Sequence, residues 1–267
     1  MTQVYVSASI FPTSIISQSG HTLLAEVVAK AGADGIEVRD ELLNRSSDSL
    51  DEIAATCQAL DMDVVFSTPT PMFLANGQVN PTIQSVFEAS ERLQAKVIKM
   101  NLGGFEQVRD PAEGMAHLQA QLGRLERTTV TIENDQRQVA NQARLIENFL
   151  TLCTEYDVPI HLTFDMGNWV FVGERMQDVA PKLMPFIRYV HVKDSELDEH
   201  GVRQTIPLDL GSPAKAADIH LLQQMTRRAP ICIEYPMPWD AHVLSREVVA
   251  LKAVQMGGIG GVVHAIV

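Results

Sequence analysis

Short runs of β-branched and aromatic residues alternate with longer amphipathic segments along the sequence, and this alternation constrains the fold more than any other feature. Parallel strands need long crossover connections, which are usually helices. A chain in which a helix follows each strand is therefore expected to form a parallel sheet. The expected strands are Val4–Ile10, Gly35–Asp40, Asp63–Ser67, Val97–Asn101, Thr129–Glu133, Pro159–Asp165, Ile187–Lys193 and Pro230–Tyr235. The expected helices are His21–Ala31, Ser49–Leu60, Thr82–Leu93, Pro111–Arg127, Gln138–Tyr156, Met176–Met184, Pro213–Arg228 and Ala241–Met256.

Eight strands alternating with eight helices predict a (β/α)₈ TIM barrel, of the α/β class. No linker or change of composition divides the chain, so we expect one domain over residues 1–267. The alternative is a doubly wound open sheet, which often carries a glycine-rich phosphate loop after its first strand. Here the segment SASIFPTS stands in that place, and it favours the barrel.

Near the end of four of the expected strands, a polar residue lies on the face opposite to the strand's apolar residues. Side chains alternate between the two faces of a strand, so Val130 and Ile132 face one side while Glu133 faces the other. In a barrel of this kind the active site lies at the carboxyl ends of the strands. We therefore expect four side chains to converge there, namely Glu133, Asp165, His191 and Glu234.

Three carboxylates and one imidazole, with no thiolate, suit a hard or borderline divalent cation such as Mn²⁺, Mg²⁺, Co²⁺ or Zn²⁺. Without a cation, acids that meet at one barrel mouth repel each other, and their pKa values rise. The alternative is that each acid pairs separately with a lysine or an arginine, for example Glu133 with Lys99. For a single acid, pairing with a basic residue accounts for its position as well as a metal ion does. For polar ligands at the ends of four successive strands, a shared metal ion is the better explanation.

The ordered motifs resemble those of the xylose isomerase-like TIM barrels, particularly the sugar isomerases and ketose 3-epimerases. The matching segments are IEND around Glu133, FDMGN around Asp165, HVKD around His191 and IEYP around Glu234. The resemblance covers essentially the whole chain. It implies one divalent metal ion, Mn²⁺ before the others, held by these four residues. It also implies that Glu133 and Glu234 are the catalytic acid/base pair, acting on a small keto sugar or keto-sugar acid through an enediolate.

Further polar and aromatic residues near the strand ends are expected to contact the substrate. Lys193 has the inward parity, and it can bind a substrate hydroxyl or carboxylate or pair with a neighbouring acid. Asn168 stands where, by resemblance, many relatives carry a substrate-binding histidine. Trp169 is expected either to form an apolar wall over the sugar or to seal a dimer contact, and Glu37 to pair with Arg39 or a lysine. The expected substrate-binding residues are Asn168, Lys193, Arg39, Asn101 and Trp169.

Charge and cysteine content limit the classes of partner. The net charge is −12, from 21 basic and 33 acidic residues, and no basic stripe is evident, so we expect neither a nucleic-acid nor a membrane partner. A DNA-repair enzyme of the AP-endonuclease type is disfavoured for the same reason, and because the additional histidines of such enzymes are missing. The three cysteines are widely spaced and are expected to be buried thiols, which favours a reducing cytoplasm. The N-terminus does not have the pattern of a secretory signal.

Three readings of the function remain open at this stage. The first is a metal-dependent sugar isomerase or epimerase with a small-molecule substrate, in a chain that can form a homodimer or homotetramer. The second is a metal-dependent lyase or dehydratase on the same scaffold, because the same intermediate can expel a β-hydroxyl group. The third is a sugar-binding protein without activity, which the intact set of four residues opposes. The segment Asp194–Ser212 is expected to be a long loop that can serve as a lid.

Overall fold

Eight parallel strands close into a barrel in a computed structural model that describes residues 2–123, 125, 127–136 and 142–254. The order around the barrel is β1-β10-β7-β6-β5-β4-β3-β2, so consecutive strands are neighbours and the last pairs with the first. These strands are β1 (Val4–Ser7), β2 (Gly35–Arg39), β3 (Asp63–Phe73), β4 (Val97–Gly103), β5 (Thr129–Glu133), β6 (Ile160–Asp165), β7 (Ile187–Val192) and β10 (Ile231–Ile233). The predicted TIM barrel is confirmed.

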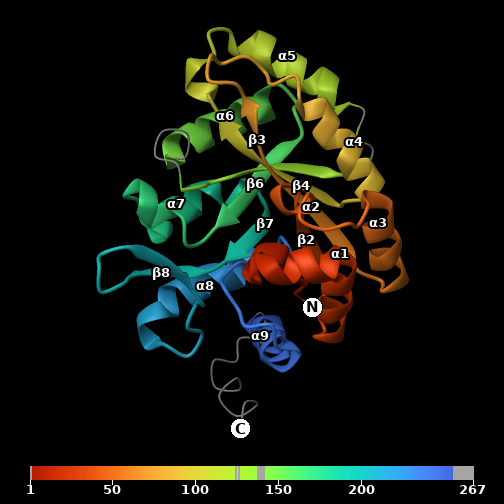
Figure 1. The fold of residues 1–267 in the computed structure, drawn as a ribbon. Helices are drawn as coiled ribbons and strands as arrows, with labels where there is room; N and C mark the ends of the chain where they lie inside the picture. The colour runs from red at the N-terminus through yellow and green to blue at the C-terminus, as the bar shows by residue number, and fades with distance from the viewer. Residues whose placement is uncertain (1, 124, 126, 137–141, 255–267) are drawn as a thin grey trace.

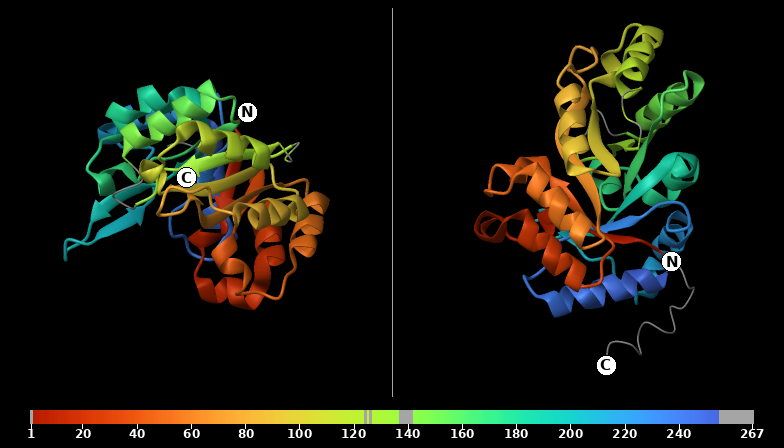
Figure 2. Two further views of the ribbon diagram at one scale, coloured as in Figure 1. Left: turned by 90° about the horizontal axis from the view of Figure 1, so that it is seen from above. Right: turned by 90° about the vertical axis from the view of Figure 1, so that its right-hand side faces the viewer.

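Helices surround the strands on the outside of the barrel, as Figures 1 and 2 show. The α-helices of the described residues are α1 (Thr13–Lys30), α2 (Asp40–Leu43), α3 (Leu50–Ala59), α4 (Ile83–Leu93), α5 (Pro111–Leu122), α6 (Ala143–Glu155), α7 (Met176–Leu183), α8 (Ala216–Met225) and α9 (Ala241–Val254). Local sequence explains several of their ends. Ser49 and Glu52 form a reciprocal capping box at the start of α3, and Asp110 caps α5, whose first residue is a proline.

The two faces of the strands carry different kinds of side chain. Outward-facing residues such as Ile132, Leu162 and Val190 are fully buried in the main apolar core, beneath the helices. A second, smaller apolar cluster fills part of the barrel interior and consists of Tyr5, Val65, Val97, Tyr189 and Cys232. Towards the carboxyl ends of the strands the inward positions become polar. All three cysteines are buried free thiols, as predicted.

One strand is longer than predicted, and one segment that was predicted to be a loop contains strands. β3 runs on to Phe73, through residues 68–73, and a register shift against β4 between Ser67 and Pro71 accommodates its prolines. The segment Asp194–Ser212 contains an antiparallel hairpin of β8 (Asp194–Leu197) and β9 (Arg203–Ile206). This hairpin projects from one side of the barrel in Figures 1 and 2. It has no continuous apolar face, which is why hydrophobic periodicity did not predict it.

Helix ends differ from the prediction by a few residues. α1 begins at Thr13, but a kink at Gly20, whose φ is +72°, divides it, and the part after the kink starts at His21 as predicted. α5 ends at Leu122 rather than Arg127. The predicted helical residues 138–141 and 255–256, and the glycine-rich tail 257–261, lie outside the described residues. Within the described ranges, no helix combines the length and the apolar character that a membrane crossing requires.

Gly103, at the end of β4, is expected to tolerate no side chain. Its φ is +73°, and an added Cβ would lie 2.2 Å from the carbonyl oxygen of Phe73. Gly173 has a similar φ of +76° but has no atom within 4 Å of an added Cβ, so it is a matched control. We expect Gly173→Ala to cost about 1 kcal/mol of unfolding free energy and Gly103→Ala clearly more, measured by urea denaturation. Equal losses would show that the contact with Phe73 does not matter.

Candidate active site

The four predicted strand-end residues meet at one point of the barrel mouth. His191 Nδ1 lies 2.8 Å from Glu133 Oε1, 2.9 Å from Glu234 Oε2 and 3.6 Å from Asp165 Oδ2. One ligand atom from each of the four residues lies within 4.8 Å of every other. They come together because β5, β6, β7 and β10 are adjacent in the barrel.

The spacing and the donor types of these atoms fit a divalent cation. Ligands at right angles around a cation with bonds of about 2.1 Å lie about 3 Å apart, close to the separations between His191 Nδ1 and the two glutamates. Asp165 adds a second sign. Its Oδ1 accepts backbone N–H bonds from Gly167 and Asn168, both at 2.9 Å, whereas, within the described residues, its buried Oδ2 has no backbone donor, faces His191 Nδ1 and contacts only charged side chains of the site. Oxygen and imidazole donors of this kind favour Mn²⁺, Mg²⁺, Co²⁺ or Zn²⁺.

Cationic side chains also contact the same carboxylates. Lys99 forms a buried ion pair with Glu133, which is the separate pairing considered above. Lys193 Nζ lies 2.6 Å from Asp165 Oδ2 and 2.8 Å from Glu234 Oε2. The acids therefore share one centre and have individual cationic partners at the same time.

These contacts govern the ionisation of the site. Burial by itself would raise the pKa of Glu133, but the charges of Lys99 and His191 outweigh it and hold the pKa of that carboxyl well below its usual range. Burial opposes ionisation of Glu234 too, and His191 and Lys193 hold the pKa of Glu234 well below its usual range. Burial would lower the pKa of His191, yet the surrounding glutamates raise it well above the usual value. Both glutamates are thus carboxylates at neutral pH.

The predicted substrate-binding residues do not all face the mouth. Arg39 Nη1 donates to Glu234 Oε1 at 2.7 Å, and Lys193 lies within the site as described. Asn101 is next to Glu133 in the β4–β5 register and donates to the carbonyl of Pro69. Asn168 donates to the carbonyl of Asn134 at 2.9 Å, so its amide braces the loop that holds Asp165.

Trp169 lies elsewhere. Its side chain is 0% exposed and packs against Phe164, with ring centroids 5.3 Å apart. Phe164 and Asp165 point to opposite faces of β6, and Phe164 faces outward. The rings of Phe164 and Trp169 therefore both belong to the apolar core between the strands and the helices. The expected wall over the sugar is therefore not formed by this ring, because the sequence position after Asp165 does not decide on which side of the strand the chain turns.

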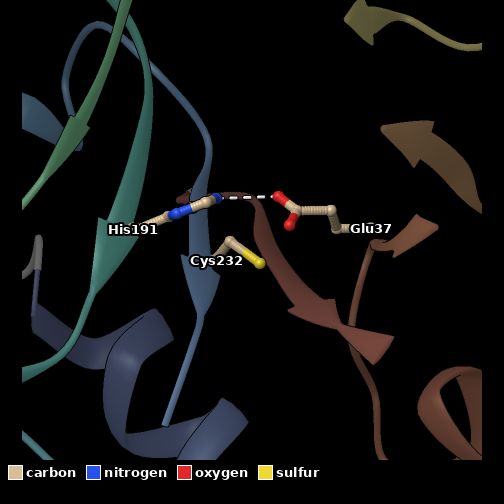
Figure 3. Close-up of side chains that lie close together, drawn as sticks. All are labelled: Glu37, His191 and Cys232. Carbon is tan, nitrogen blue, oxygen red and sulfur yellow. Dashed lines mark hydrogen bonds and ion pairs between the residues drawn. The ribbon is translucent and has the colours of Figure 1, made fainter. Parts of the chain in front are cut away.

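The structure adds two residues to those predicted. Asn134 brackets the backbone of Asp165: its Oδ1 accepts the Asp165 N–H at 2.8 Å, and its Nδ2 donates to the Asp165 carbonyl at 2.9 Å. The Glu37 carboxylate lies 2.7 Å from His191 Nε2. Figure 3 marks this contact with a dashed line. Glu37 also forms the predicted pair with Arg39, whose Nη1 lies 3.4 Å from Glu37 Oε1. The sequence suggested that Glu37 pairs with Arg39 or a lysine, but it could not identify a partner across the barrel. No sequence signal distinguished Asn134 from an ordinary loop asparagine.

Comparisons with known proteins agree with this fold. A sequence profile for a family described as xylose isomerase-like TIM barrel matches residues 25–255. A solved L-ribulose 3-epimerase is 13% identical, with a TM-score of 0.68 over 100% of this chain and 98% of that one. A probable 3-DHS dehydratase from Bacillus anthracis is 14% identical, with a TM-score of 0.62 over 94% of this chain and 98% of the other.

A further similar structure is a xylose isomerase-like TIM barrel/4-hydroxyphenylpyruvate dioxygenase fusion protein, 14% identical with a TM-score of 0.66. The alignment covers 95% of this chain but only 43% of that protein, so this chain spans less than half of its length. A sequence search among curated proteins found no match. At these identities the structural likeness concerns the fold.

Replacement of Lys99 is expected to destabilise the metal-free protein strongly. Lys99→Met leaves the buried Glu133 carboxylate without its ammonium partner, and breaking a buried pair in this way costs about 3–5 kcal/mol. Lys96→Met is the matched control, because Lys96 pairs with Asp63 while its side chain is 62% exposed, and such pairs contribute at most about 1 kcal/mol. Urea unfolding of both variants measures the difference. Equal losses would contradict a structural role for the Lys99–Glu133 pair.

The metal-free protein is expected to lose stability in acid. A carboxyl group whose folded pKa lies below its unfolded value of 4.5 contributes stability above pH 4.5 and loses it as the pH falls towards the folded pKa. Glu133 is such a group, so unfolding free energy should decline from about pH 5 to about pH 3. Glu133→Gln lacks this group and should decline less steeply over the same range. Parallel declines would show that Glu133 is not the residue that titrates.

Proposed function

Because the chain belongs to the xylose isomerase-like TIM barrel family, we propose that it is a divalent-metal-dependent sugar isomerase or epimerase that acts on a small keto sugar or keto-sugar acid. One observation carries this proposal above the others. Carboxylate oxygens of Glu133 and Glu234 face the same point from two different strands, and Asp165 and His191 complete a set of four ligands there. The similarity to an L-ribulose 3-epimerase is in keeping with it.

The residues that would hold the metal are Glu133, Asp165, His191 and Glu234. A divalent cation in that position, with Mn²⁺ as our first choice, supplies Lewis-acid polarisation of a substrate carbonyl, which acidifies the neighbouring carbon. His191 is expected to contribute one ring nitrogen, and Asp165 its Oδ2, the oxygen that faces His191 Nδ1.

Glu133 and Glu234 are proposed as the acid/base pair. Both are ionised at neutral pH, which is the state that a proton acceptor requires. If one glutamate removes the proton and the other returns it to the opposite face of the same carbon, the product is an epimer. If the proton returns to the adjacent carbon, an aldose and a ketose are interconverted. Lys99 and Arg39 bind the remaining oxygens of Glu133 and Glu234, respectively, and fix the orientation of the two carboxylates.

Lys193 and Arg39 are proposed to contact the substrate as well. Their positive charges suit sugar hydroxyls or the carboxylate of a keto-sugar acid. Asn101, beside Glu133, and Asn168, in the loop that follows Asp165, are proposed as further substrate contacts. We further propose a cytoplasmic enzyme whose partner is a small molecule, in a homodimer or a homotetramer, with no nucleic-acid or membrane partner.

A dehydratase is the second candidate. It is favoured by the similarity of this chain to a probable 3-DHS dehydratase, at the same level of identity as to the epimerase. Removal of a proton next to a carbonyl is common to both reactions, and they differ in whether a β-hydroxyl group then leaves. The experiment below separates them through the product.

Proton exchange at carbon provides the test of the proposed chemistry. Protein loaded with Mn²⁺ in D₂O is expected to introduce deuterium next to the carbonyl of at least one member of a panel of keto sugars and keto-sugar acids, measured by NMR after metal removal. EDTA should abolish the exchange, and added Mn²⁺ should restore it. A dehydrated product would favour the second candidate. Absence of both exchange and product across the panel would contradict an enzymatic role in this chemistry.

Replacement of either glutamate should remove turnover without unfolding the protein. Glu133→Gln and Glu234→Gln each delete a proton acceptor, so exchange should fall by at least about 100-fold. Glu113→Gln, on the exposed surface of α5, is a matched control and should leave the rate unchanged. Circular dichroism verifies that each variant is folded. Normal exchange in either site variant would refute the assignment of the acid/base pair.

A further inference from the structure

We propose that Glu37 is a positioning residue, which holds the His191 ring so that Nδ1, and not Nε2, is the nitrogen presented to the metal. This inference rests on the proposed metal site. It concerns a residue of β2, whereas the ligands lie at the ends of β5, β6, β7 and β10. β1 and β10 separate β2 from β7 around the barrel, so Glu37 reaches His191 through the barrel interior.

The contact between Glu37 and His191 is direct and shielded from solvent. Both side chains are 0% exposed, and Glu37 Oε2 lies 2.7 Å from His191 Nε2. Figure 3 shows the carboxylate pointing at that nitrogen across the interior of the barrel. The other ring nitrogen, Nδ1, is the one that lies 2.8 Å from Glu133 Oε1 and 2.9 Å from Glu234 Oε2. The ring is therefore held between Glu37 on one side and the ligand oxygens on the other.

The Glu37 carboxylate is itself fixed. Its Oε2 also accepts the hydroxyl hydrogen bond of Tyr189 at 3.0 Å. Its Oε1 accepts hydrogen bonds from Ser7 Oγ at 3.2 Å and from Arg39 Nη1 at 3.4 Å. Donors from three strands thus hold a single carboxylate in one orientation, and the carboxylate in turn holds the ring.

The chemistry of the pair selects the tautomer. An ionised carboxylate only accepts hydrogen bonds, so Nε2 must carry the hydrogen that it donates to Glu37. A neutral imidazole with its hydrogen on Nε2 has its lone pair on Nδ1. Nδ1 faces the oxygens of Glu133, Asp165 and Glu234. In the metal-free protein Nδ1 carries a hydrogen as well, and a cation that replaced this hydrogen would meet the Nδ1 lone pair. A carboxylate behind a metal-bound histidine also increases the electron density on the ligating nitrogen.

The rival arrangement would use the opposite side of the ring. Glu37, His191 and Cys232 also offer ligand atoms within 4.8 Å of one another, and all three are buried. In that arrangement Nε2 would bind the cation, and Glu37 would be a ligand. The proposal and its rival thus assign opposite roles to the two nitrogens of one ring.

NMR of the unmodified protein decides between the two arrangements. Protein labelled with ¹⁵N-histidine and loaded with Zn²⁺, which is diamagnetic, is expected to show His191 with Nδ1 bound to the metal and Nε2 carrying a hydrogen. Loss of the signals in His191→Gln assigns them. A metal-bound Nε2 in the unmodified protein would overturn the proposal, and this measurement does not depend on whether any Glu37 variant folds.

Metal affinity tests the positioning role separately from folding. Glu37→Gln keeps the size of the side chain and one acceptor oxygen but removes the charge, and Zn²⁺ affinity measured by calorimetry is expected to fall about 10- to 100-fold. Glu37→Asp keeps the charge but shortens the side chain, and is expected to weaken Zn²⁺ binding as well. Glu113→Gln, on the exposed surface of α5, is the control, because it removes a surface charge and should leave the Zn²⁺ affinity unchanged.

The outcomes distinguish this inference from the proposed function. If Glu37→Gln binds Zn²⁺ as tightly as the unmodified protein, Glu37 does not position His191, whereas the metal site itself stands. If the unmodified protein binds no Zn²⁺, the metal site is refuted and the positioning role with it. A purely structural Glu37 would lower the melting temperature of Glu37→Gln and leave both the Zn²⁺ affinity and the His191 tautomer unchanged.

Discussion

The burial of four carboxylates at the mouth of one barrel is the constraint on which the rest of the site depends. An isolated ionised carboxylate in such a place would be very costly, so each must have a cationic partner. The carboxylates are Glu37, Glu133, Asp165 and Glu234. The cationic partners in the described residues are Arg39, Lys99, His191 and Lys193, all within the same mouth. Because these partners come from β2, β4, β7 and the residue after β7, the charges link opposite sides of the barrel.

The barrel separates stability from chemistry by means of the two faces of its strands. Outward side chains such as Ile132 and Phe164 pack beneath the helices and contribute the large apolar burial on which folding depends. Inward side chains form an apolar layer around Tyr5 and Tyr189 and, above it, the polar site. Tyr189 belongs to both layers, because its ring packs in the interior cluster while its hydroxyl bonds to Glu37. Packed side chains therefore fill the barrel interior beneath the site, as is usual in TIM barrels.

The same carboxylates can form ion pairs with lysines and also serve as ligands of a metal ion. A cation at the shared centre and the ammonium groups of Lys99 and Lys193 use overlapping oxygens. Paired acids and a metal site are thus not exclusive alternatives. The lysines compensate the buried charge, while His191 Nδ1 and Asp165 Oδ2 face the shared centre. Sequence reasoning treated these as competing explanations because it could not see that each carboxylate has two oxygens with different neighbours.

The sequence by itself determined the barrel and the four convergent residues. Strand period and strand count follow from local alternation, and parity decides which residues face inward, so Glu133, Asp165, His191 and Glu234 could be named without coordinates. The tertiary structure alone decided the contacts across the barrel and the turns beyond the strand ends. It paired Glu37 with His191, placed Trp169 in the outer core and folded residues 194–206 into a hairpin. Parity fixes the face of a strand, but the partner of a side chain on that face depends on how the sheet closes, which no local pattern encodes.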